Sequence, residues 1–392
     1  MNKNILHTEI QEYINNNLNT DTSKILFKGT AFPNVTIQEI VEQIEAKKKC
    51  KNKLPTWFST KNIYYPNKLN IEQTSSEVTA AYKSNLVFGN SLIDLTGGYG
   101  VDSYHFSKKI KTIIHCEINE NLSEIVAHNY QELGVKNCKI IPKNGLNFLQ
   151  KSVENFDWIY VDPSRRNDTK EKVFLLKDCL PNIPENIDLL FEKSNNILIK
   201  NSPILDITSA INELKYVKEV HIVAVHNEVK ELLFILEKNY INSPITKTIN
   251  VYNENIQLFN YQFFNSTTSS YSLTKEYLYE PNAAILKSGG FHEVSAQYKV
   301  EKLHQHSHLY TSDELIDFPG RRFRILHTIT FDKKKLKKLI PTGKANITTR
   351  NFPQSVGQIR KKTGLKDGGN QYLFFTTDMN DKRIIIICKK TI

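Results

Sequence analysis

The stretch "LIDLTGGYGVDSYHF", residues 92–106, joins a short apolar run to a glycine-rich turn and then to a helical pattern. The apolar residues lead into Asp94, the chain turns from Thr96 to Gly100, and a helix is predicted to begin near Val101. Glycines suit this turn because a side chain would keep the backbone from a ligand at the strand's carboxyl end, and because tight turns use positive φ. The helix N-terminus adds amide donors, so the sequence predicts a ligand site here.

A second acid, Glu117 of IHCEIN, ends the next predicted strand, 23 residues after Asp94. A carboxylate at that position binds ribose hydroxyls, which both a dinucleotide and S-adenosylmethionine carry. The dinucleotide fingerprint G-x-G-x-x-G is absent, since the glycines run G-G-x-G and an acid precedes them. Asp94 would repel a pyrophosphate but can serve the ammonium group of a methionine. The pattern therefore favours S-adenosyl-L-methionine as the cofactor.

The segment after residue 73 alternates strand-like and helical patterns, which is typical of a parallel, doubly wound α/β sheet. The strand-like runs are SLIDL, TIIHCEI, CKIIP, FDWIYVD, NILIK and VHIVAV. After His226 and Asn227, the run KELLFIL follows too closely for a crossover helix, so an antiparallel hairpin is predicted. The expected fold is a parallel sheet that ends in an antiparallel hairpin.

The flanking segments differ in pattern from this sheet. Residues 5–50 have helical periodicity, and Thr36 with Glu39 fits a capping box. A second capping box, Thr74 with Glu77, predicts a helix that stops at Gly89. Beyond residue 271, glycine, proline and aromatic residues cluster, which indicates small α+β domains joined near FPGR. The predicted domains are a helical domain (residues 1–72), a cofactor-binding domain (73–270), a small α+β domain (271–320) and a basic domain (321–392).

Four segments, LIDLTGGYGVD, HCEIN, KNG and VDPSRR, resemble motifs I to IV of class I S-adenosylmethionine-dependent methyltransferases. The resemblance implies a Rossmann-like sheet with a reversed final strand. It also implies that Thr96–Gly100 cradles the methionine end of the cofactor, that Glu117 binds the ribose and that Asn144 lies beside the adenine. The cofactor-binding residues expected from the pattern and the resemblance are Asp94, Thr96, Gly97, Gly98, Gly100, Glu117, Asn144 and Gly145.

The fourth motif indicates the methyl acceptor. In amino-directed methyltransferases that this motif resembles, an acid or amide, two prolines and an aromatic residue hold an exocyclic amine. Asp162 and Pro163 match that pattern, Ser164 replaces the second proline, and Arg165, which can stack on a base or bind a phosphate, replaces the aromatic residue. These four residues are the candidate catalytic set, with Asp162 orienting the amine.

The atom that receives the methyl group is expected to be guanine N2. The segment DLTGGYGVD resembles that of a bacterial ribosomal guanine-N2 methyltransferase. Carbon methylation at uridine C5 requires a cysteine nucleophile, but KNSP follows the fifth strand and Cys179 falls in a predicted helix. Carbon methylation is therefore disfavoured.

The charge of the chain is concentrated at its end. The net charge is +11, and the residues from Arg321 onward hold 18 Lys and Arg against four Asp and Glu. So basic a segment predicts a polyanionic partner.

The end of the chain also resembles known domains. The THUMP-like domain of predicted methyltransferases from Bacteroidetes-type bacteria is resembled by the segment FPGRRFRILHTITFDKKKLKKLIPTGKANITTRNFP, and its ferredoxin-like companion is resembled by YLYEPNAAILKSGGF. True THUMP domains bind structured RNA, which implies a tRNA or rRNA partner. The candidate RNA-binding residues are Arg321, Arg322, Arg324, Lys344, Arg350, Arg360, Lys361 and Lys362.

Other classes of protein are disfavoured by composition. No apolar run is long enough to cross a bilayer, the start lacks a signal-peptide core, and a cytoplasmic location is expected. Five scattered cysteines indicate neither a disulfide framework nor a zinc site. His304, His306 and His308 would share one face of a strand, but they lack an evident supporting acid and no metal is expected.

The predicted function is a methyltransferase that acts on structured RNA at an exocyclic base amine such as guanine N2. Two alternatives stay open: a small-molecule or protein methyltransferase with a solubilising basic segment, and an RNA-binding protein whose methyltransferase site is degenerate.

Overall fold

The computed structural model describes the chain apart from residues 30–31, 166–174, 254, 265–266 and 392. The contacts between residues divide it into two compact units. Unit 1 consists of Met1–Glu219 and Glu231–Asn242, and unit 2 consists of Val220–Lys230 and Ser243–Ile392. Each unit has hydrophobic core clusters of its own.

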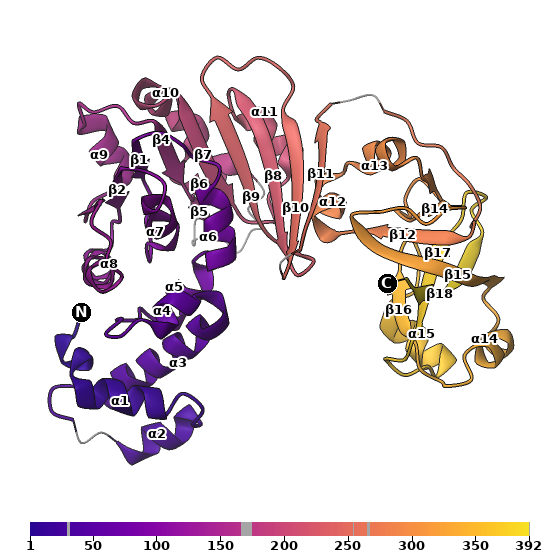
Figure 1. Ribbon diagram of the computed structural model, residues 1–392, viewed down its shortest axis with the longest axis horizontal. Helices are drawn as coiled ribbons and strands as arrows, with labels where there is room; N and C mark the ends of the chain where they lie inside the picture. The colour runs from indigo at the N-terminus through magenta and orange to yellow at the C-terminus, as the bar shows by residue number, and fades with distance from the viewer. Residues whose placement is uncertain (30–31, 166–174, 254, 265–266, 392) are drawn as a thin grey trace. The chain divides into compact units, whose positions relative to one another are not determined.

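Unit 1 begins with a group of short helices, drawn in indigo in Figure 1. They are η1 (Lys3–Leu6), α1 (Thr8–Asn16), α2 (Thr22–Lys28), α3 (Ile37–Lys53), α4 (Pro55–Ser59) and α5 (Lys68–Gln73). The capping box predicted for Thr36 and Glu39 is confirmed at the start of α3. The buried Trp57 packs its ring edge against Tyr104, with 4.8 Å between ring centroids. The helical group therefore shares a core with the sheet domain that follows.

Six strands of a nine-stranded sheet lie mainly in unit 1, and five of them are parallel to one another. These strands are β1 (Ser91–Asp94), β2 (Thr112–Cys116), β3 (Cys138–Ile141), β4 (Trp158–Val161), β7 (Asn196–Asn201) and β9 (Glu228–Glu237). They run in the order β3-β2-β1-β4-β7-β9, and β9 pairs antiparallel with β7. Figure 1 shows the helices that flank these strands: α6 (Glu77–Ser84), α7 (Val101–Ser107), α8 (Glu120–Glu132), α9 (Gly145–Lys151), α10 (Ile183–Lys193) and α11 (Ile207–Glu213). The predicted α/β fold is confirmed.

The reversed strand follows a tight turn. Strand β8 (Val217–Val225) is joined to β9 by His226 and Asn227, whose φ angles are 51° and 62°. Two successive left-handed residues form the type I′ turn, whose twist matches that of the strands it joins. The predicted hairpin is therefore confirmed, and its residues explain the turn.

Two local predictions were wrong. Helix α6 ends at Ser84, and Ser76 rather than Thr74 caps it by accepting a hydrogen bond from the Thr79 amide. The Glu77 carboxylate instead accepts hydrogen bonds from the amide and hydroxyl of Thr56, at 2.6 and 2.7 Å, so this tertiary contact replaces the capping box. Cys179 lies in the short strand β6 (Cys179–Leu180), which follows η2 (Leu176–Asp178) and pairs with β5 (Ser164–Arg165).

Unit 2 contains an antiparallel pair, β10 (Ile245–Tyr252) and β11 (Asn255–Gln262), and a seven-stranded sheet. The sheet order is β13-β14-β12-β15-β18-β17-β16. The strands are β12 (Tyr277–Pro281), β13 (Glu301–Lys302), β14 (Tyr310–Ser312), β15 (Gly320–Thr330), β16 (Asn346–Thr349), β17 (Gln371–Thr377) and β18 (Arg383–Lys390). The helices are α12 (Ala283–Ser288), α13 (Phe291–Tyr298), α14 (Lys333–Leu339) and α15 (Val356–Thr363).

Both faces of this sheet are covered. Alternate residues point to opposite faces of a strand, and in β17 Phe375 belongs to one buried cluster while Phe374 belongs to another. The first cluster includes Leu336 of α14 and Ile359 of α15, so both helices cover one face. The sheet continues past residue 320, because β12 pairs with β15. The domain boundaries at residues 72, 270 and 320 stay predictions.

Candidate active site

The glycine turn follows β1 at the carboxyl edge of the parallel sheet. The Gly97 amide donates to the carbonyl of Cys116 at 2.8 Å, which draws the turn against the end of β2. A Cβ at Gly97 would lie 2.1 Å from the His115 ring, and one at Gly100, whose φ is 79°, would lie 2.7 Å from the Tyr130 hydroxyl. Side chains are therefore excluded at both positions, and the turn lies tight against β2 and α8.

Asp94 lies beneath this turn and is 1 % exposed. One carboxylate oxygen accepts the Thr96 amide at 3.0 Å, and the other accepts the Ser103 hydroxyl at 2.6 Å. Burial raises the pKa of Asp94 to about 7, although the hydrogen bonds from Ser103 and Thr96 oppose the rise. Asp94 thus ties the turn to α7, and its predicted contact with the cofactor ammonium stays a prediction.

Glu117 joins the same turn from the end of β2. Its carboxylate accepts the Gly98 amide at 2.9 Å and the Asn119 amide at 2.8 Å, while the side chain stays partly exposed. The next residue, Ile118, is 68 % exposed. An acid and an exposed apolar side chain therefore stand side by side at this edge.

Asn144 and Gly145 follow β3 at the same edge. Asn144 is exposed and caps α9 by accepting the Asn147 amide at 3.1 Å. Gly145 is buried, and a Cβ there would lie 2.3 Å from the Leu95 carbonyl oxygen. The backbone after β3 consequently approaches the backbone that leads into the glycine turn.

Asp162 follows β4 and is connected to the turn through its backbone. Its amide donates to the Thr96 hydroxyl at 2.7 Å. Its carboxylate forms an ion pair with Lys200, the penultimate residue of β7, and about a third of the Asp162 side chain is exposed. Thr96 therefore brings the candidate cofactor turn and the candidate catalytic acid together.

The other residues of the fourth motif, Pro163, Ser164 and Arg165, follow Asp162 in the sequence. Pro163 is buried, and the Ser164 hydroxyl donates to the Leu180 carbonyl at 3.4 Å. The backbone of Arg165 belongs to β5, but its side chain lies outside the described part of the chain, as does Arg166. The predicted stacking or phosphate contact of Arg165 thus stays a prediction.

Lys200 was missed by the sequence analysis. Its side chain is 12 % exposed. Burial acts to lower the pKa of Lys200, but the carboxylates of Asp162, Asp102 and Glu231 outweigh burial and raise it above the usual value. The available signal was a single lysine at the end of the apolar run NILIK. A charge in that position needs a partner in the crevice, but the sequence does not name the partner.

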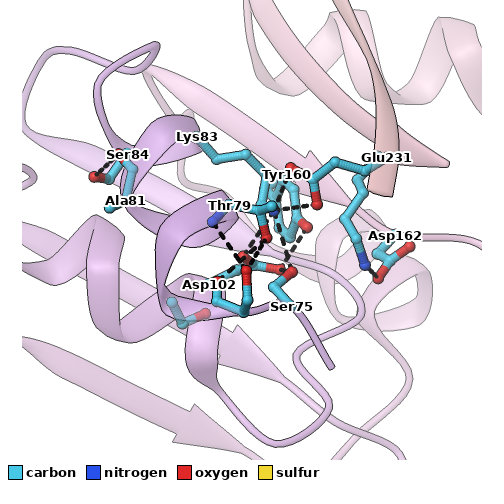
Figure 2. Close-up of polar contacts among 12 residues, drawn as sticks. Ser75, Thr79, Ala81, Lys83, Ser84, Asp102, Tyr160, Asp162 and Glu231 are labelled. Atoms are coloured by element: carbon cyan, nitrogen blue, oxygen red, sulfur yellow. Dashed lines mark hydrogen bonds and ion pairs between the residues drawn. The ribbon is translucent and has the colours of Figure 1, made fainter. Parts of the chain in front are cut away.

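A buried ionic cluster lies next to this pair. Figure 2 shows Lys83, Asp102, Tyr160 and Glu231 pointing toward one another near Asp162. Lys83 contacts the two Glu231 oxygens at 2.8 and 2.7 Å and Asp102 at 3.2 Å. Asp102 also accepts the Tyr160 hydroxyl at 2.8 Å. These contacts tie α6, α7, β4 and β9 together behind the site.

The candidate RNA-binding residues of unit 2 fall into two groups. The arginines are all ion-paired: Arg321 and Arg350 with Glu280, Arg322 with Asp317, Arg324 with Glu276, and Arg360 with Asp367. Lys344, Lys361 and Lys362 are exposed, and no carboxylate in the described part of the chain lies within ion-pair distance of them. The candidate RNA-binding residues therefore differ in their ion pairing: the arginines are paired with acids, and within the described ranges the three lysines are not.

The three alternating histidines do not lie on a strand, so they do not share a strand face. They lie in the connection between β13 and β14. His304 binds Asp381 at 3.0 Å, and His308 stacks on Phe291 with 3.5 Å between ring centroids. In the ranges that the structure describes, no three His, Cys, Asp or Glu side chains are grouped so as to hold a metal ion.

Comparison with solved structures identifies the family. A proposed methyltransferase from Porphyromonas gingivalis W83 is 32% identical to the chain, with a TM-score of 0.87 over 100% of this chain and 99% of that chain. This chain belongs to the same methyltransferase family. The family model of a ferredoxin-like domain matches residues 277–319, and that of a THUMP domain-like segment matches residues 320–390. The resemblance found in the sequence is thereby confirmed.

Other solved methyltransferases align with a smaller part of this family member. An rRNA methylase from Streptococcus thermophilus is 14% identical, with a TM-score of 0.31 over 42% of this chain and 98% of that chain. A proposed methyltransferase from Streptococcus mutans in complex with SAH is 14% identical, with a TM-score of 0.31 over 41% of this chain and 96% of that chain. Among curated proteins, none matches the chain. The described helices include none with the length and apolar character needed to cross a membrane.

Proposed function

We propose that this chain is an S-adenosylmethionine-dependent methyltransferase that modifies an exocyclic base amine, with guanine N2 as the leading acceptor, in structured RNA. The observation that carries the proposal is the convergence of the glycine turn, Glu117 and Asp162 at one edge of the sheet. The Gly98 amide donates to Glu117, and the Thr96 hydroxyl accepts the Asp162 amide. That edge is where doubly wound sheets bind ligands.

The residues at this edge fit the cofactor. Each oxygen of the Glu117 carboxylate accepts one amide hydrogen bond and keeps a further lone pair for the two ribose hydroxyls. Ile118 offers an exposed apolar face to the adenine ring. The backbone from Thr96 to Gly100 provides a surface without obstructing side chains at Gly97 and Gly98 for the methionine end. When bound, the cofactor supplies an activated methyl group.

Asp162 is the proposed positioning group for the acceptor amine. Lys200 holds one of its oxygens, Oδ2, and no hydrogen bond to Oδ1 is formed within the described residues. Oδ1 can therefore accept a hydrogen from an exocyclic amine and turn its lone pair toward the methyl group. Methyl transfer depends mainly on alignment, so a fixed carboxylate suffices, and it can take up the proton that the amine releases.

RNA is the proposed substrate because the basic excess lies in the THUMP-like segment. Lysine and arginine bind nucleic acid by displacing counterions from phosphates. A small-molecule methyltransferase would not need that excess.

The cofactor is tested by calorimetric titration with S-adenosylhomocysteine. We expect micromolar binding that is lost in Glu117→Ala and kept in Glu120→Ala, which removes an exposed acid of α8 and serves as the matched control. Wild-type protein that does not bind, or equal binding by both variants, would refute the proposed cofactor site.

The acceptor role is tested with Asp162→Ala, which removes the oxygen that accepts the amine hydrogen; Asp162→Asn, which keeps one such oxygen, is the comparison and should lose less. We expect methyl incorporation by the alanine variant into RNA from cells lacking the protein to fall by about a hundredfold or more, while the affinities for S-adenosylhomocysteine and RNA stay unchanged. Unchanged incorporation would exclude Asp162 from the site. Wild-type protein that binds both ligands without turnover would instead support an RNA-binding protein with a degenerate site.

A further inference from the structure

A set of exposed lysines lies on the outer side of α14 and α15 in unit 2. The exposed residues are Lys333, Lys334, Lys335, Lys337 and Lys338 of α14 and Lys361 and Lys362 of α15. Leu336 and Ile359 point inward to the same buried cluster, and the two helices contact each other. The two helices therefore cover the same face of the sheet, their lysines are exposed, and we call this set the lysine face.

Among the described residues, no carboxylate forms a side-chain ion pair with the lysines of this face. The four acids that follow residue 320 all have other partners. Asp332 caps α14, and Asp367 pairs with Arg360. Asp378 accepts the amides of Asn380 and Lys382, and Asp381 pairs with His304. Asp332 adjoins the face, because its carboxylate accepts the amides of Lys334 and Lys335, so the face holds many more cations than carboxylates.

The arginines of the same segment are placed differently. Glu280, 3 % exposed, accepts hydrogen bonds from Arg321 at 2.6 Å and Arg350 at 2.8 Å. Arg322 and Arg324 have acidic partners next to them, at 3.1 and 2.9 Å. A phosphate that approached these arginines would compete with a carboxylate and be repelled by it, whereas the lysine side chains of the lysine face are not held by a carboxylate among the described residues.

We propose that the lysine face of α14 and α15 is the surface on which the phosphate backbone of structured RNA docks, and that the paired arginines mainly hold unit 2 together. This proposal rests on the proposed function for the identity of the polyanion. It also adds the five lysines of α14 to the candidate residues and assigns the paired arginines a lesser part in binding.

The features of α14 favour RNA over a lipid surface. A helix that binds a membrane inserts an apolar face, but Leu336 is 1 % exposed and Ile340, which follows the helix, is 2 % exposed. The exposed positions of α14 are lysines alone. Closely spaced cations without an apolar face suit a dense row of phosphates.

The test compares two full-length variants that lose cations from different places. Lys334→Gln/Lys335→Gln/Lys338→Gln removes three charges from the lysine face, and Arg321→Gln/Arg322→Gln/Arg324→Gln removes three paired arginines. The probe is a hairpin RNA with a 20-base-pair stem, and its Kd is measured between 50 and 300 mM salt. Circular dichroism and thermal unfolding establish that each variant folds, and Arg322→Gln/Arg324→Gln replaces the arginine variant if loss of the Glu280 contact unfolds it.

We expect the lysine variant to bind at least about tenfold more weakly at 100 mM salt and to lose about two to three units of the slope of log Kd against log salt. The arginine variant should change the Kd by less than about threefold. Equal losses, a larger loss in the arginine variant, or binding to anionic phospholipid vesicles but not to the hairpin would overturn the proposal. Failure of the wild-type protein to bind the hairpin would also overturn the proposal. The proposed cofactor site would still be tested separately by the calorimetric titration with S-adenosylhomocysteine.

Discussion

At the scale of single residues, Asp94 and Asp162 are both acids at strand ends of unit 1, but their surroundings differ. Asp94 is enclosed by neutral donors from Thr96 and Ser103, whereas Asp162 is partly exposed and paired with Lys200. A neutral environment disfavours a carboxylate, and a paired cation favours one. Substitution of the two acids should therefore have different effects.

Asp94→Asn should make the stability of the protein less dependent on pH. The folded-state pKa of Asp94, about 7, lies above the unfolded value of about 3.9, so the native state binds the proton more tightly and the free energy of unfolding falls as pH rises from about 4 to about 7. Asparagine removes this titration, and Ser103 can accept its amide hydrogen while donating to His115, 3.2 Å away.

Urea unfolding between pH 4.5 and 7.5 measures this effect. The stability of Asp94→Asn relative to the wild type should rise across that window, by at most about 4 kcal/mol. Parallel stability curves for the two proteins would show that Asp94 titrates at its ordinary pKa.

Lys200→Met should lower turnover more than it lowers cofactor affinity. Methionine fills a similar volume but leaves the Asp162 carboxylate unheld, and small misplacements of a positioning group cost up to about a hundredfold in rate. Lys200→Arg keeps the cation and should restore part of kcat. Steady-state methylation gives kcat and KM, and thermal unfolding controls for the loss of a buried charge.

The expectation for Lys200 is a fall in kcat with an unchanged Kd for S-adenosylhomocysteine. Equal turnover by the methionine variant and the wild type would mean that Asp162 needs no cationic partner.

At the scale of elements, Glu280 joins three parts of the unit 2 sheet. It lies on β12, and its partners are Arg321 on β15 and Arg350 just after β16. In sequence these are two acid–base pairs separated by about 40 and 70 residues, and no local pattern connects them. The contact with Arg321 exists because β12 pairs with β15 in a register that sets Glu280 opposite Arg321.

Glu280→Gln should destabilise unit 2 by about 3–5 kcal/mol, because two partly buried guanidinium groups would lose their shared carboxylate. The matched control is Glu276→Gln on an exposed pair with Arg324, which should cost less than about 1 kcal/mol. Chemical denaturation followed by circular dichroism measures both. Similar values for the two variants would indicate that Glu280 is not a structural centre.

At the scale of the whole molecule, charge and ligand sites are segregated along the sequence. The excess of basic residues lies after residue 320, whereas the candidate cofactor site lies between Asp94 and Lys200. Salt screens exposed charges far more than it affects buried contacts. The two binding steps should therefore respond to ionic strength in different ways.

Raising the salt concentration from 50 to 200 mM should lower kcat/KM for RNA by roughly a hundredfold, given about four phosphate contacts. The Kd for S-adenosylhomocysteine should change by less than about twofold. Calorimetry and methyl incorporation in the same buffers measure the two quantities. A parallel loss of both would mean that salt acts on the fold rather than on RNA docking.

Local patterns in the sequence predicted much of unit 1. Apolar runs between polar turns marked the strands, since burial on both faces demands apolar side chains. The turn at His226 and Asn227 marked the reversed strand, and the capping box at Thr36 and Glu39 marked the start of α3. The family motifs added the turn and Glu117, because close approaches of the backbone leave glycines in the sequence.

Local sequence patterns account for the parallel strands with the reversed strand β9, the glycine turn at the sheet edge, and the basic character of the residues after 320. Which charges meet depends on the fold. Folding pairs Lys200 with Asp162 and gives Arg321 and Arg350 a shared partner in Glu280, while no carboxylate among the described residues forms an ion pair with the lysines of α14. The physical reason is range: patterns of burial and turns act over a few residues, whereas the partner of a charge is set by strands that pair across tens or hundreds of residues.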